Sequence, residues 1–380
     1  MRRHMRGVAV AAVALSVMSM AACAKDSGGG NTSNNSSGGA ACEYATPPTA
    51  PATSATSTAA GDKVDASALK VGLAYDIGGR GDASFNDSAA AGLDKAVTDF
   101  GVKKENVREL TAAPSEDEAA KQTRLRQLAS EGFNVVVAVG FAYAEALKVV
   151  APQYPNVKFG LVDAAVEGVP NVQALTFAEH EGSFLAGVIA AYQSKKCHVG
   201  FVGGVDIPLI QKFEAGYLQG AQAAAPKIKV EKKYLTPAGD FTGFQDPPKG
   251  QEAAKGQIDK GADVIYQAAG ASGKGVFSAA KQGGALAIGV DSDQYNQKTV
   301  EESKDIIVSS MLKRVDVAVY DFIRAVAKND LASLPKVFDL KVDGVGYSTT
   351  GGKIDDKLKG ILEGYKAQII EGKITVKDKP

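Results

Sequence analysis

The stretch VGLAYDIGGRGDASFND, residues 71–87, has the pattern of a short strand, a glycine-rich turn and the start of a helix. Its turn holds three glycines, which let the backbone take positive φ and let another group approach closely. One aromatic ring, Phe85, stands among three aspartates. The stretch therefore predicts a strand followed by a turn whose side chains and backbone contact a guest molecule.

Similar strand-like runs alternate with longer helix-like segments through the rest of the chain, which predicts an α/β fold with parallel sheets. The chain also matches itself at an offset of 128 residues: Val71 matches Val199, Phe85 matches Phe213, and Gly92 matches Gly220. FGLVD, ending at Asp163, matches AIGVD, ending at Asp291, at the same offset. Shared strand spacing among α/β sheets is the alternative explanation, but the constant register favours two similar βαβ lobes.

The N-terminus has the features of a secretory signal, with a positive start and an apolar run of small residues over 1–22. Cys23 follows the small residues as in a bacterial lipobox, so we expect lipidation there; ordinary signal cleavage is the alternative. Residues 23–68, mostly Gly, Ser, Asn, Thr, Ala and Pro, are expected to form a flexible tether. The protein is thus expected on the outer face of the cytoplasmic membrane, held by a lipid.

Charge and cysteine content narrow the possible partners. Loss of Arg2, Arg3 and Arg6 with the signal takes the formal net charge from zero to −3, so we expect no nucleic-acid partner. No later apolar run approaches the ~20 residues of a membrane span.

Cys42 and Cys197 can pair outside the cell or remain as two thiols, and the sequence leaves both open.

The matched phenylalanines predict a binding site between the lobes. In doubly wound sheets, ligands lie outside the carboxyl ends of the strands, and the polar residues here follow strands. Two lobes related by a pseudo-twofold would bring Phe85 and Phe213, expected at the starts of equivalent helices, to opposite sides of one cleft. Such rings favour a flat aromatic guest, and nearby carboxylates accept hydrogen bonds from its N–H or hydroxyl groups. Each ring could instead be an ordinary core residue of its helix.

With these residues the chain resembles the basic membrane protein family of substrate-binding lipoproteins. The resemblance covers residue 70 to about residue 347 and rests on several stretches: YDIGGRGDASFNDSAAAG, YPNVKFGLVD, EGSFLAGVIAA, VGFVGGVDIPLIQKFEAGYLQGA, IGVDSDQ and SSMLKR. It implies a type I periplasmic-binding-protein fold with two Rossmann-like lobes and a ligand cleft at the hinge. We expect the N-terminal lobe over 69–175 plus about 306–345, and the C-terminal lobe over 176–305 plus about 346–380.

The same resemblance implies the ligand and the residues that bind it. Family members serve ABC-type importers and bind purine nucleosides, so the expected ligand is adenosine, guanosine or inosine and the expected protein partner is an ABC permease. Carried onto matching positions, with lining residues added, the expected ligand-binding set is Asp76, Asp82, Phe85, Asn86, Phe141, Phe213, Gly270, Asp291 and Lys313. We expect a monomer with no cofactor and no metal.

Two other functions remain possible from the residues. After signal cleavage the histidines are His180 and His198, and neither stands in a recognisable catalytic pattern, so an enzyme such as a nucleoside hydrolase is the weaker alternative. A binding protein of the same fold for a sugar or another small solute is the other alternative, because fold alone does not decide the guest.

Overall fold

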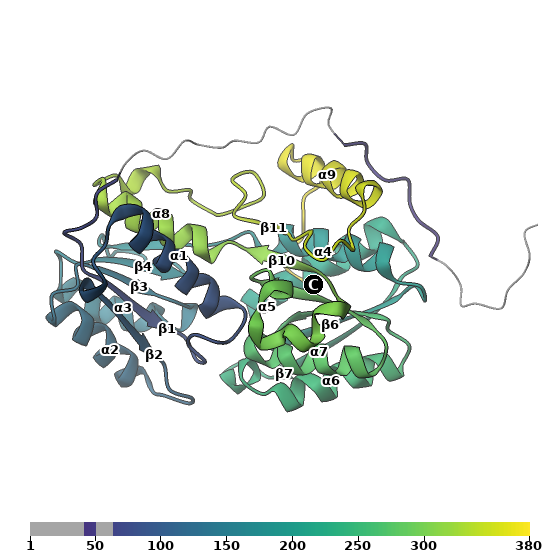
Figure 1. Ribbon diagram of the computed structural model, residues 1–380, viewed down its shortest axis with the longest axis horizontal. Helices are drawn as coiled ribbons and strands as arrows, with labels where there is room; N and C mark the ends of the chain where they lie inside the picture. The colour runs from purple at the N-terminus through teal and green to yellow at the C-terminus, as the bar shows by residue number, and fades with distance from the viewer. Residues whose placement is uncertain (1–41, 51–63) are drawn as a thin grey trace, which may run out of the picture. The chain divides into compact units, whose positions relative to one another are not determined.

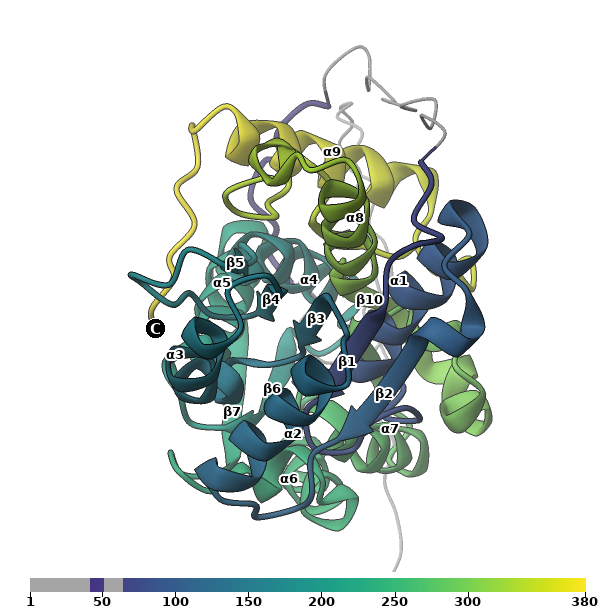
Figure 2. The ribbon, with the colours of Figure 1, turned by 90° about the vertical axis from the view of Figure 1, so that its left-hand side faces the viewer.

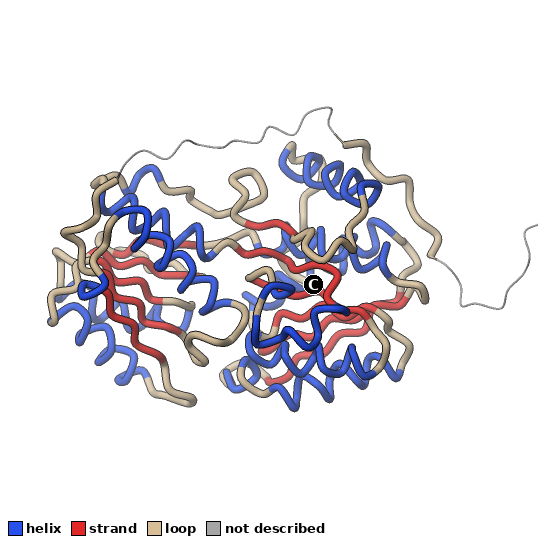
Figure 3. The backbone as a smooth tube through the Cα atoms, in the orientation of Figure 1, coloured by secondary structure: helices blue, strands red, loops and turns tan. Residues whose placement is uncertain are grey.

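The computed structural model describes residues 42–50 and 64–380. The expected signal, Cys23 and the rest of the tether lie outside the described residues. The described part forms one compact unit, within which the strands gather into two sheets with helices packed against them (Figures 1 and 3). The α/β class with parallel sheets, predicted from sequence, is confirmed.

The first sheet has five parallel strands in the order β2-β1-β3-β4-β5. Its strands are β1 (Val71–Tyr75), β2 (Val107–Thr111), β3 (Val135–Ala138), β4 (Lys158–Val162) and β5 (Val172–Leu175). The helices between them are α1 (Phe85–Phe100), α2 (Glu118–Ser130) and α3 (Ala144–Val150). Strands β1 and β3 are buried along their whole length, as expected for the centre of a parallel sheet covered on both faces.

The second sheet has the order β11-β10-β9-β8-β6-β7. Its strands are β6 (His198–Val205), β7 (Lys229–Thr236), β8 (Val264–Ala268), β9 (Leu286–Asp291), β10 (Ile307–Lys313) and β11 (Val345–Tyr347). Its helices are α5 (Pro208–Ala224), α6 (Pro247–Asp259) and α7 (Gly273–Gln282). Without the antiparallel strand β11, the order repeats that of the first sheet, and this is the flavodoxin-like doubly wound order.

Two helices carry the chain between the sheets. After β5 the chain enters α4 (Glu179–Gln193), which packs on α5; after β10 it enters α8 (Val315–Ala327), which packs on α1. Helices α1 and α8 lie side by side in Figures 1 and 2. The last helix, α9 (Asp356–Ile370), packs on α4.

One lobe boundary differs from the prediction. The sequence assigned about 306–345 to the N-terminal lobe, but β10 pairs with β9 and therefore belongs to the second sheet. The chain crosses back only after Lys313, at the start of α8. The physical reason is that β10 is the strand equivalent to β5, so it completes its own sheet before the crossing.

The repeat at offset 128 is also visible in the packing of α1 and α5, the first helix after the first strand of each sheet. A Cβ atom on Gly92 of α1 would lie 2.3 Å from the carbonyl oxygen of Asp316 in α8. A Cβ atom on Gly220 of α5 would lie 1.9 Å from the carbonyl oxygen of Phe184 in α4. Both contacts exclude any side chain, so the matched glycines allow the same close helix–helix approach in each lobe.

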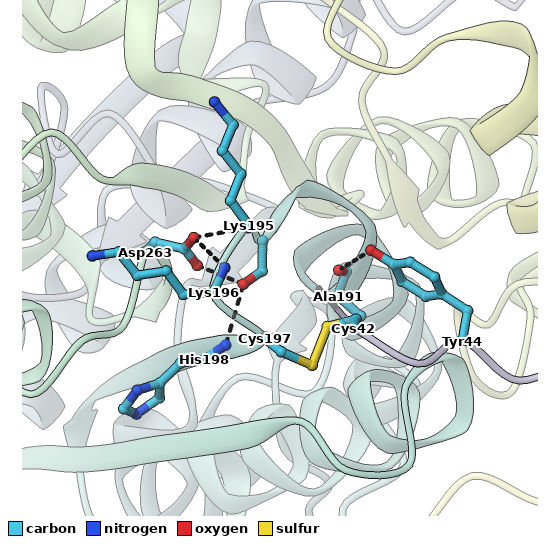
Figure 4. The surroundings of a disulfide bond; sticks show 9 residues. Cys42, Tyr44, Ala191, Lys195, Lys196, Cys197, His198 and Asp263 are labelled. Atoms are coloured by element: carbon cyan, nitrogen blue, oxygen red, sulfur yellow. Dashed lines mark hydrogen bonds between the residues drawn. A yellow bond between two sulfur atoms is a disulfide. The ribbon is translucent and has the colours of Figure 1, made fainter. Parts of the chain in front are cut away.

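Residues 42–50, which the sequence assigned to the flexible tether, pack on the second lobe. Cys42 forms a disulfide with Cys197, with a Cα–Cα distance of 5.0 Å (Figure 4). The ring of Tyr44 stacks on Tyr192 with centroids 4.6 Å apart, and its hydroxyl donates to the carbonyl oxygen of Ala191 at 3.3 Å. Of the two states that the sequence left open, the structure therefore has the paired cysteines.

Over residues 42–50 and 64–380, no helix combines the length and the apolar character that crossing a membrane requires.

Candidate functional site

A cavity lies at the carboxyl ends of the strands of both sheets, where a doubly wound fold is expected to bind its ligand. It is lined from the first half by the turn after β1 and the residues after β3 and β4, and from the second half by α5, the loop after β7 and the ends of β8, β9 and β10. The structure brings all nine residues predicted from sequence into its lining: Asp76, Asp82, Phe85, Asn86, Phe141, Phe213, Gly270, Asp291 and Lys313.

The two matched phenylalanines face the same group in this cavity. The Nζ atom of Lys313 lies 4.7 Å from the ring centroid of Phe85 and 5.8 Å from that of Phe213. Phe85 is the first residue of α1, but α5 begins at Pro208, so Phe213 lies in the second turn rather than at the helix start as predicted. The second half begins its helix earlier, yet the ring still reaches the cavity.

Lys313 is the buried cation of the site. Its Nζ donates a hydrogen bond to Asp163 Oδ2 at 2.6 Å, and both side chains are almost completely buried. Burial acts to lower the pKa of Lys313, but the negative charges of Asp163, Asp291 and Glu179 outweigh it and raise the pKa above its usual value. The ammonium group is therefore charged at neutral pH and held between three carboxylates.

Asp163 and Asp291 occupy equivalent positions, one at the end of each fourth strand. Both have left-handed backbones, with φ of 70° and 62°, and both line the cavity. Asp163 Oδ1 is buried and accepts no hydrogen bond from any described residue. Asp163 was not among the predicted site residues, although its match to Asp291 at offset 128 was the signal that could have identified it.

Two predicted site residues shape the turn after β1. Asp82 Oδ1 accepts from the backbone N–H groups of Ser84 and Asp87, and its Oδ2 accepts from the backbone and side-chain N–H groups of Asn86. The side chain of Asn86 is also fully used, because its Oδ1 accepts from the N–H of Asp76 and its Nδ2 donates to the carbonyl oxygen of Ile77. These two polar groups therefore fix the turn, and loss of solvation raises the pKa of Asp82 to about 6.

Asp76 keeps one oxygen free for the cavity. Its Oδ1 accepts from the N–H of Ile77 at 2.8 Å, while no hydrogen bond to Oδ2 comes from the described residues. Gly140 makes room for this carboxylate, since a Cβ atom there would lie 2.6 Å from Oδ2. Burial raises the pKa of Asp76 to about 6, and the neighbouring negative charge of Asp163 acts in the same direction.

An aromatic wall closes the site between the lobes. Phe141, after β3, meets Phe241, after β7, edge to face with centroids 5.6 Å apart. Phe244 also lines the cavity, beside Gly270, whose Cβ would lie 3.2 Å from the carbonyl oxygen of Phe244. Sequence reasoning missed Phe241 and Phe244 because the equivalent loop of the first half, residues 112–117, is shorter and has no aromatic residue, so the repeat gave no signal.

Within residues 42–50 and 64–380, no group of three or more His, Cys, Asp or Glu side chains is arranged to hold a metal ion.

Comparison with known families matches residues 68–379 to the Bmp family model, described as "ABC transporter substrate-binding protein PnrA-like". The chain belongs to the Bmp family. This membership confirms the resemblance deduced from the sequence motifs, and it makes the protein a substrate-binding protein of the ABC-transporter type.

Relatives and a solved structure agree with this membership. The chain is 32% identical to the "ABC transporter nucleoside-binding protein BmpA" of Lactococcus lactis over 334 residues, covering 82% of this chain and 90% of the relative. It is 38% identical over 331 residues to an uncharacterized lipoprotein of Pyrococcus abyssi, covering 81% and 78%. The crystal structure of an ABC transporter solute-binding protein from Aeropyrum pernix superposes with a TM-score of 0.66 and 29% identity, covering 81% of this chain and 92% of that one. The periplasmic-binding-protein fold of this Bmp protein, predicted from sequence, is confirmed.

Proposed function

We propose that this Bmp protein captures purine nucleosides outside the cytoplasmic membrane and delivers them to an ABC permease. The observation that carries the proposal is the convergence of Phe85 and Phe213, one from each half, on the buried ammonium group of Lys313. Two rings facing one cavity from opposite lobes fit a planar heterocycle. The nucleoside-binding name of the Lactococcus lactis relative supports the same ligand class.

Each part of a nucleoside finds a matching group in the cavity. The base fits between the phenylalanine rings, where an aromatic pair contributes ~0.5–1.5 kcal/mol beyond its buried area. The carboxylates of Asp76, Asp163 and Asp291 accept hydrogen bonds from ribose hydroxyls or base N–H groups. The ammonium group of Lys313 donates to a hydroxyl or ring nitrogen, and its charge is already balanced by the acids around it.

Binding also explains how a permease could distinguish loaded from empty protein. A ligand that contacts both halves stabilises the conformation in which the lobes are together, but only by its greater affinity for that conformation. Burial of the base contributes about 25 cal/mol per Å² of apolar surface removed from water. The permease then binds the ligand-bound conformation in preference to the empty one, and this transfer requires no chemical change in the ligand.

We also propose that a lipid on Cys23 holds the protein at the membrane. Cys42, which the disulfide joins to Cys197 of the second lobe, lies 19 residues along the chain from Cys23. The test is fractionation of cells that produce the wild type or Cys23→Ser. The wild type is expected with the membranes and the variant is not; equal distribution of the two contradicts the anchor.

The ligand is tested by thermal denaturation against a panel of purine nucleosides, pyrimidine nucleosides, free bases, sugars and amino acids. A purine nucleoside at 100 times its dissociation constant is expected to add about 2.7 kcal/mol to the free energy of unfolding. Ribose and free amino acids are expected to leave the transition unchanged. A shift by a sugar but not by any nucleoside contradicts the proposal.

The same samples separate binding from hydrolysis. After incubation with inosine, chromatography is expected to return the intact nucleoside. Release of the free base in proportion to protein concentration would instead make the protein a nucleoside hydrolase.

A further inference from the structure

Part of the turn before α1 is buried in the opposite lobe. Ala83 belongs to the first half of the chain, yet its side chain is fully buried in an apolar cluster of second-half residues. The fully or almost fully buried members of that cluster are Phe277, Ala280, Ala285, Ala287, Val300 and Ile307. The methyl group of Ala83, a residue of the first lobe, therefore packs in an apolar pocket formed by the second lobe.

The backbone around Ala83 is held by the second half as well. Lys274 Nζ donates to the carbonyl oxygen of Gly81 at 2.6 Å. Gln294 Nε2 donates to the carbonyl oxygen of Ala83 at 2.8 Å, and Ser292 Oγ donates to that of Ser84 at 2.7 Å. Three carbonyl groups within residues 81–84 thus accept hydrogen bonds from three different side chains across the lobes.

The backbone conformation at Ala83 is stabilised by contacts inside the first lobe. Ala83 has φ of 63°, which a residue with a Cβ adopts at a cost of order 1–3 kcal/mol unless its surroundings impose it. Asp87 imposes it, because its Oδ1 accepts from the N–H of Gly81 at 2.7 Å and its Oδ2 accepts from the N–H of Ala83 at 2.9 Å. Both hydrogen bonds lie within the first lobe, so the shape of the turn does not depend on the second lobe and little ordering entropy is lost when the two meet.

This contact is connected directly to the ligand cavity. Ser84 Oγ donates to Asp291 Oδ2 at 2.6 Å, and Asp291 lines the cavity. Phe85 follows Ser84 in the chain and also lines the cavity, whereas Ala83, Ser292 and Gln294 do not. Separation of the lobes at this contact would move Phe85 and remove a hydrogen-bond partner from Asp291.

We propose that residues 81–84 form an interlobe latch and that Ala83 is a positioning residue that sets ligand affinity without touching the ligand. The latch stabilises the arrangement in which both phenylalanine rings face the cavity, so it raises the fraction of protein competent to bind. Apparent affinity is the intrinsic affinity multiplied by that fraction, so a weaker latch weakens binding. A ligand held between the lobes leaves when they separate, so a weaker latch also speeds release. The prediction for affinity rests on the proposed solute-binding function, whereas the prediction for lobe separation does not.

The test compares Ala83→Asn with Ala83→Gly. Asparagine tolerates the left-handed backbone, but its amide is too large and too polar for a pocket lined by alanine, valine, isoleucine and phenylalanine. Glycine keeps the backbone and removes only the methyl group. For Ala83→Asn we expect at least tenfold weaker affinity for the stabilising nucleoside, mainly through faster dissociation, and a larger radius of gyration of the ligand-free protein in X-ray scattering. For Ala83→Gly we expect changes of at most about threefold.

The readouts separate a latch from a general defect. The melting temperature of ligand-free Ala83→Asn is expected to stay within a few degrees of the wild type, because the turn lies between lobes rather than inside one. Wild-type affinity together with an unchanged radius of gyration overturns the latch. A loss of affinity that accompanies a lower melting temperature of the ligand-free protein, with no increase in its radius of gyration, overturns it as well.

A second variant tests the latch from the other lobe. Ser292→Ala with Lys274→Ala removes two of the three donors, and both positions are outside the cavity lining. If Ala83→Asn does not fold, this double variant tests the latch in its place. The control is Lys255→Ala, because the side chain of Lys255 forms an ion pair with Asp259 on the exposed face of α6 and does not contact the latch. We expect faster dissociation and a larger radius of gyration only for the double variant, and wild-type values for it overturn the proposal. If the wild type binds no nucleoside, the scattering comparison still tests the latch.

Discussion

The turns that follow the first strand of each half are built very differently, although the two halves share one topology. Nine residues, 76–84, connect β1 to α1, whereas only residues 206 and 207 connect β6 to α5. The longer turn carries Asp76, Asp82 and the latch, and three of its carbonyl groups accept hydrogen bonds from side chains of the second half. The shorter turn lets α5 begin earlier, so this half presents Leu209, Ile210 and Phe213 to the cavity.

The difference shows how a repeated fold can bind an asymmetric molecule. Both halves supply one ring and one carboxylate in the left-handed conformation at matched positions, Phe85 with Asp163 and Phe213 with Asp291. The first half adds the glycine-rich polar turn, and the second adds the aromatic loop of Phe241 and Phe244. A nucleoside has the same asymmetry, because its sugar is polar and its base is flat and largely apolar on its faces.

Lys313 joins the two halves electrostatically, so its removal is expected to have the largest effect. Lys313→Met keeps the length of the side chain but leaves Asp163, Asp291 and Glu179 without their buried cation. We expect a loss of about 3–5 kcal/mol in the free energy of unfolding. Urea denaturation measures it. Because protonation of the acids can relieve their repulsion, the loss is expected to shrink at low pH; a loss that is independent of pH contradicts this account.

The disulfide is the next largest difference, since only the second half is cross-linked to the N-terminal segment. Its loop of 155 residues is long, so reduction or Cys42→Ser is expected to lower the free energy of unfolding by about 2–4 kcal/mol. Calorimetry with and without reductant measures this. Ligand affinity is expected to stay within about twofold, because neither cysteine lines the cavity. A large loss of affinity at unchanged stability would contradict the separation of these roles.

The matched rings allow a direct comparison of the two halves. Phe85→Ala and Phe213→Ala are each expected to weaken nucleoside binding by about 1–3 kcal/mol, the usual loss when a stacking ring is removed. Only Phe213→Ala is also expected to lower stability strongly, because Phe213 is 2% exposed whereas Phe85 is partly exposed. Titration calorimetry gives the affinities. If one ring has no effect on binding, the guest is held by one half alone.

The polar turn of the first half predicts a pH dependence. Because burial raises the pKa of Asp76 to about 6, its contribution to the free energy of unfolding is greatest below about pH 4 and is lost as the pH rises through 6. Ligand binding responds in the opposite sense, since an ionised carboxylate accepts hydrogen bonds from the ligand. With a pKa of about 6, affinity is expected to be about tenfold lower at pH 5 than at pH 7.5.

The control for this prediction is the other buried acid of the same turn. Asp76→Asn is expected to flatten the pH dependence of binding. Asp82→Asn is expected to retain it, because the oxygens of Asp82 already accept hydrogen bonds within the turn. If Asp82→Asn flattens the profile and Asp76→Asn does not, the assignment of the free acceptor is reversed.

The sequence predicted the framework from local patterns that occur twice, and it predicted many of the cavity-lining residues from that repeat and from the family motifs. Apolar runs marked the strands, and the offset of 128 paired Phe85 with Phe213 and Asp163 with Asp291. The family motifs placed Lys313, and the structure brings it to the same cavity. Features of this kind depend on residues close in sequence or on a register shared by both halves.

The remaining features depend on contacts between distant segments without a repeat. Cys42 and Cys197 are 155 residues apart, and they meet where the segment around Tyr44 packs on the second lobe, with the N–H of Ala45 donating to the carbonyl oxygen of Ala224 at 2.9 Å. Phe241 and Phe244 lie in the loop between β7 and α6, and the equivalent loop of the first half is shorter and has no aromatic residue. The seating of Ala83 among second-half residues could not be read from composition, because a single alanine in a polar turn carries no sign of burial.

The crystal structure of the protein with a bound purine nucleoside is the most direct test of the central claim. We expect the base to lie between the rings of Phe85 and Phe213, within stacking distance of both, with the ribose beside Asp291 and Lys313. A base bound outside these rings, or rings that turn into the cores of their own lobes when the ligand is present, would contradict the account.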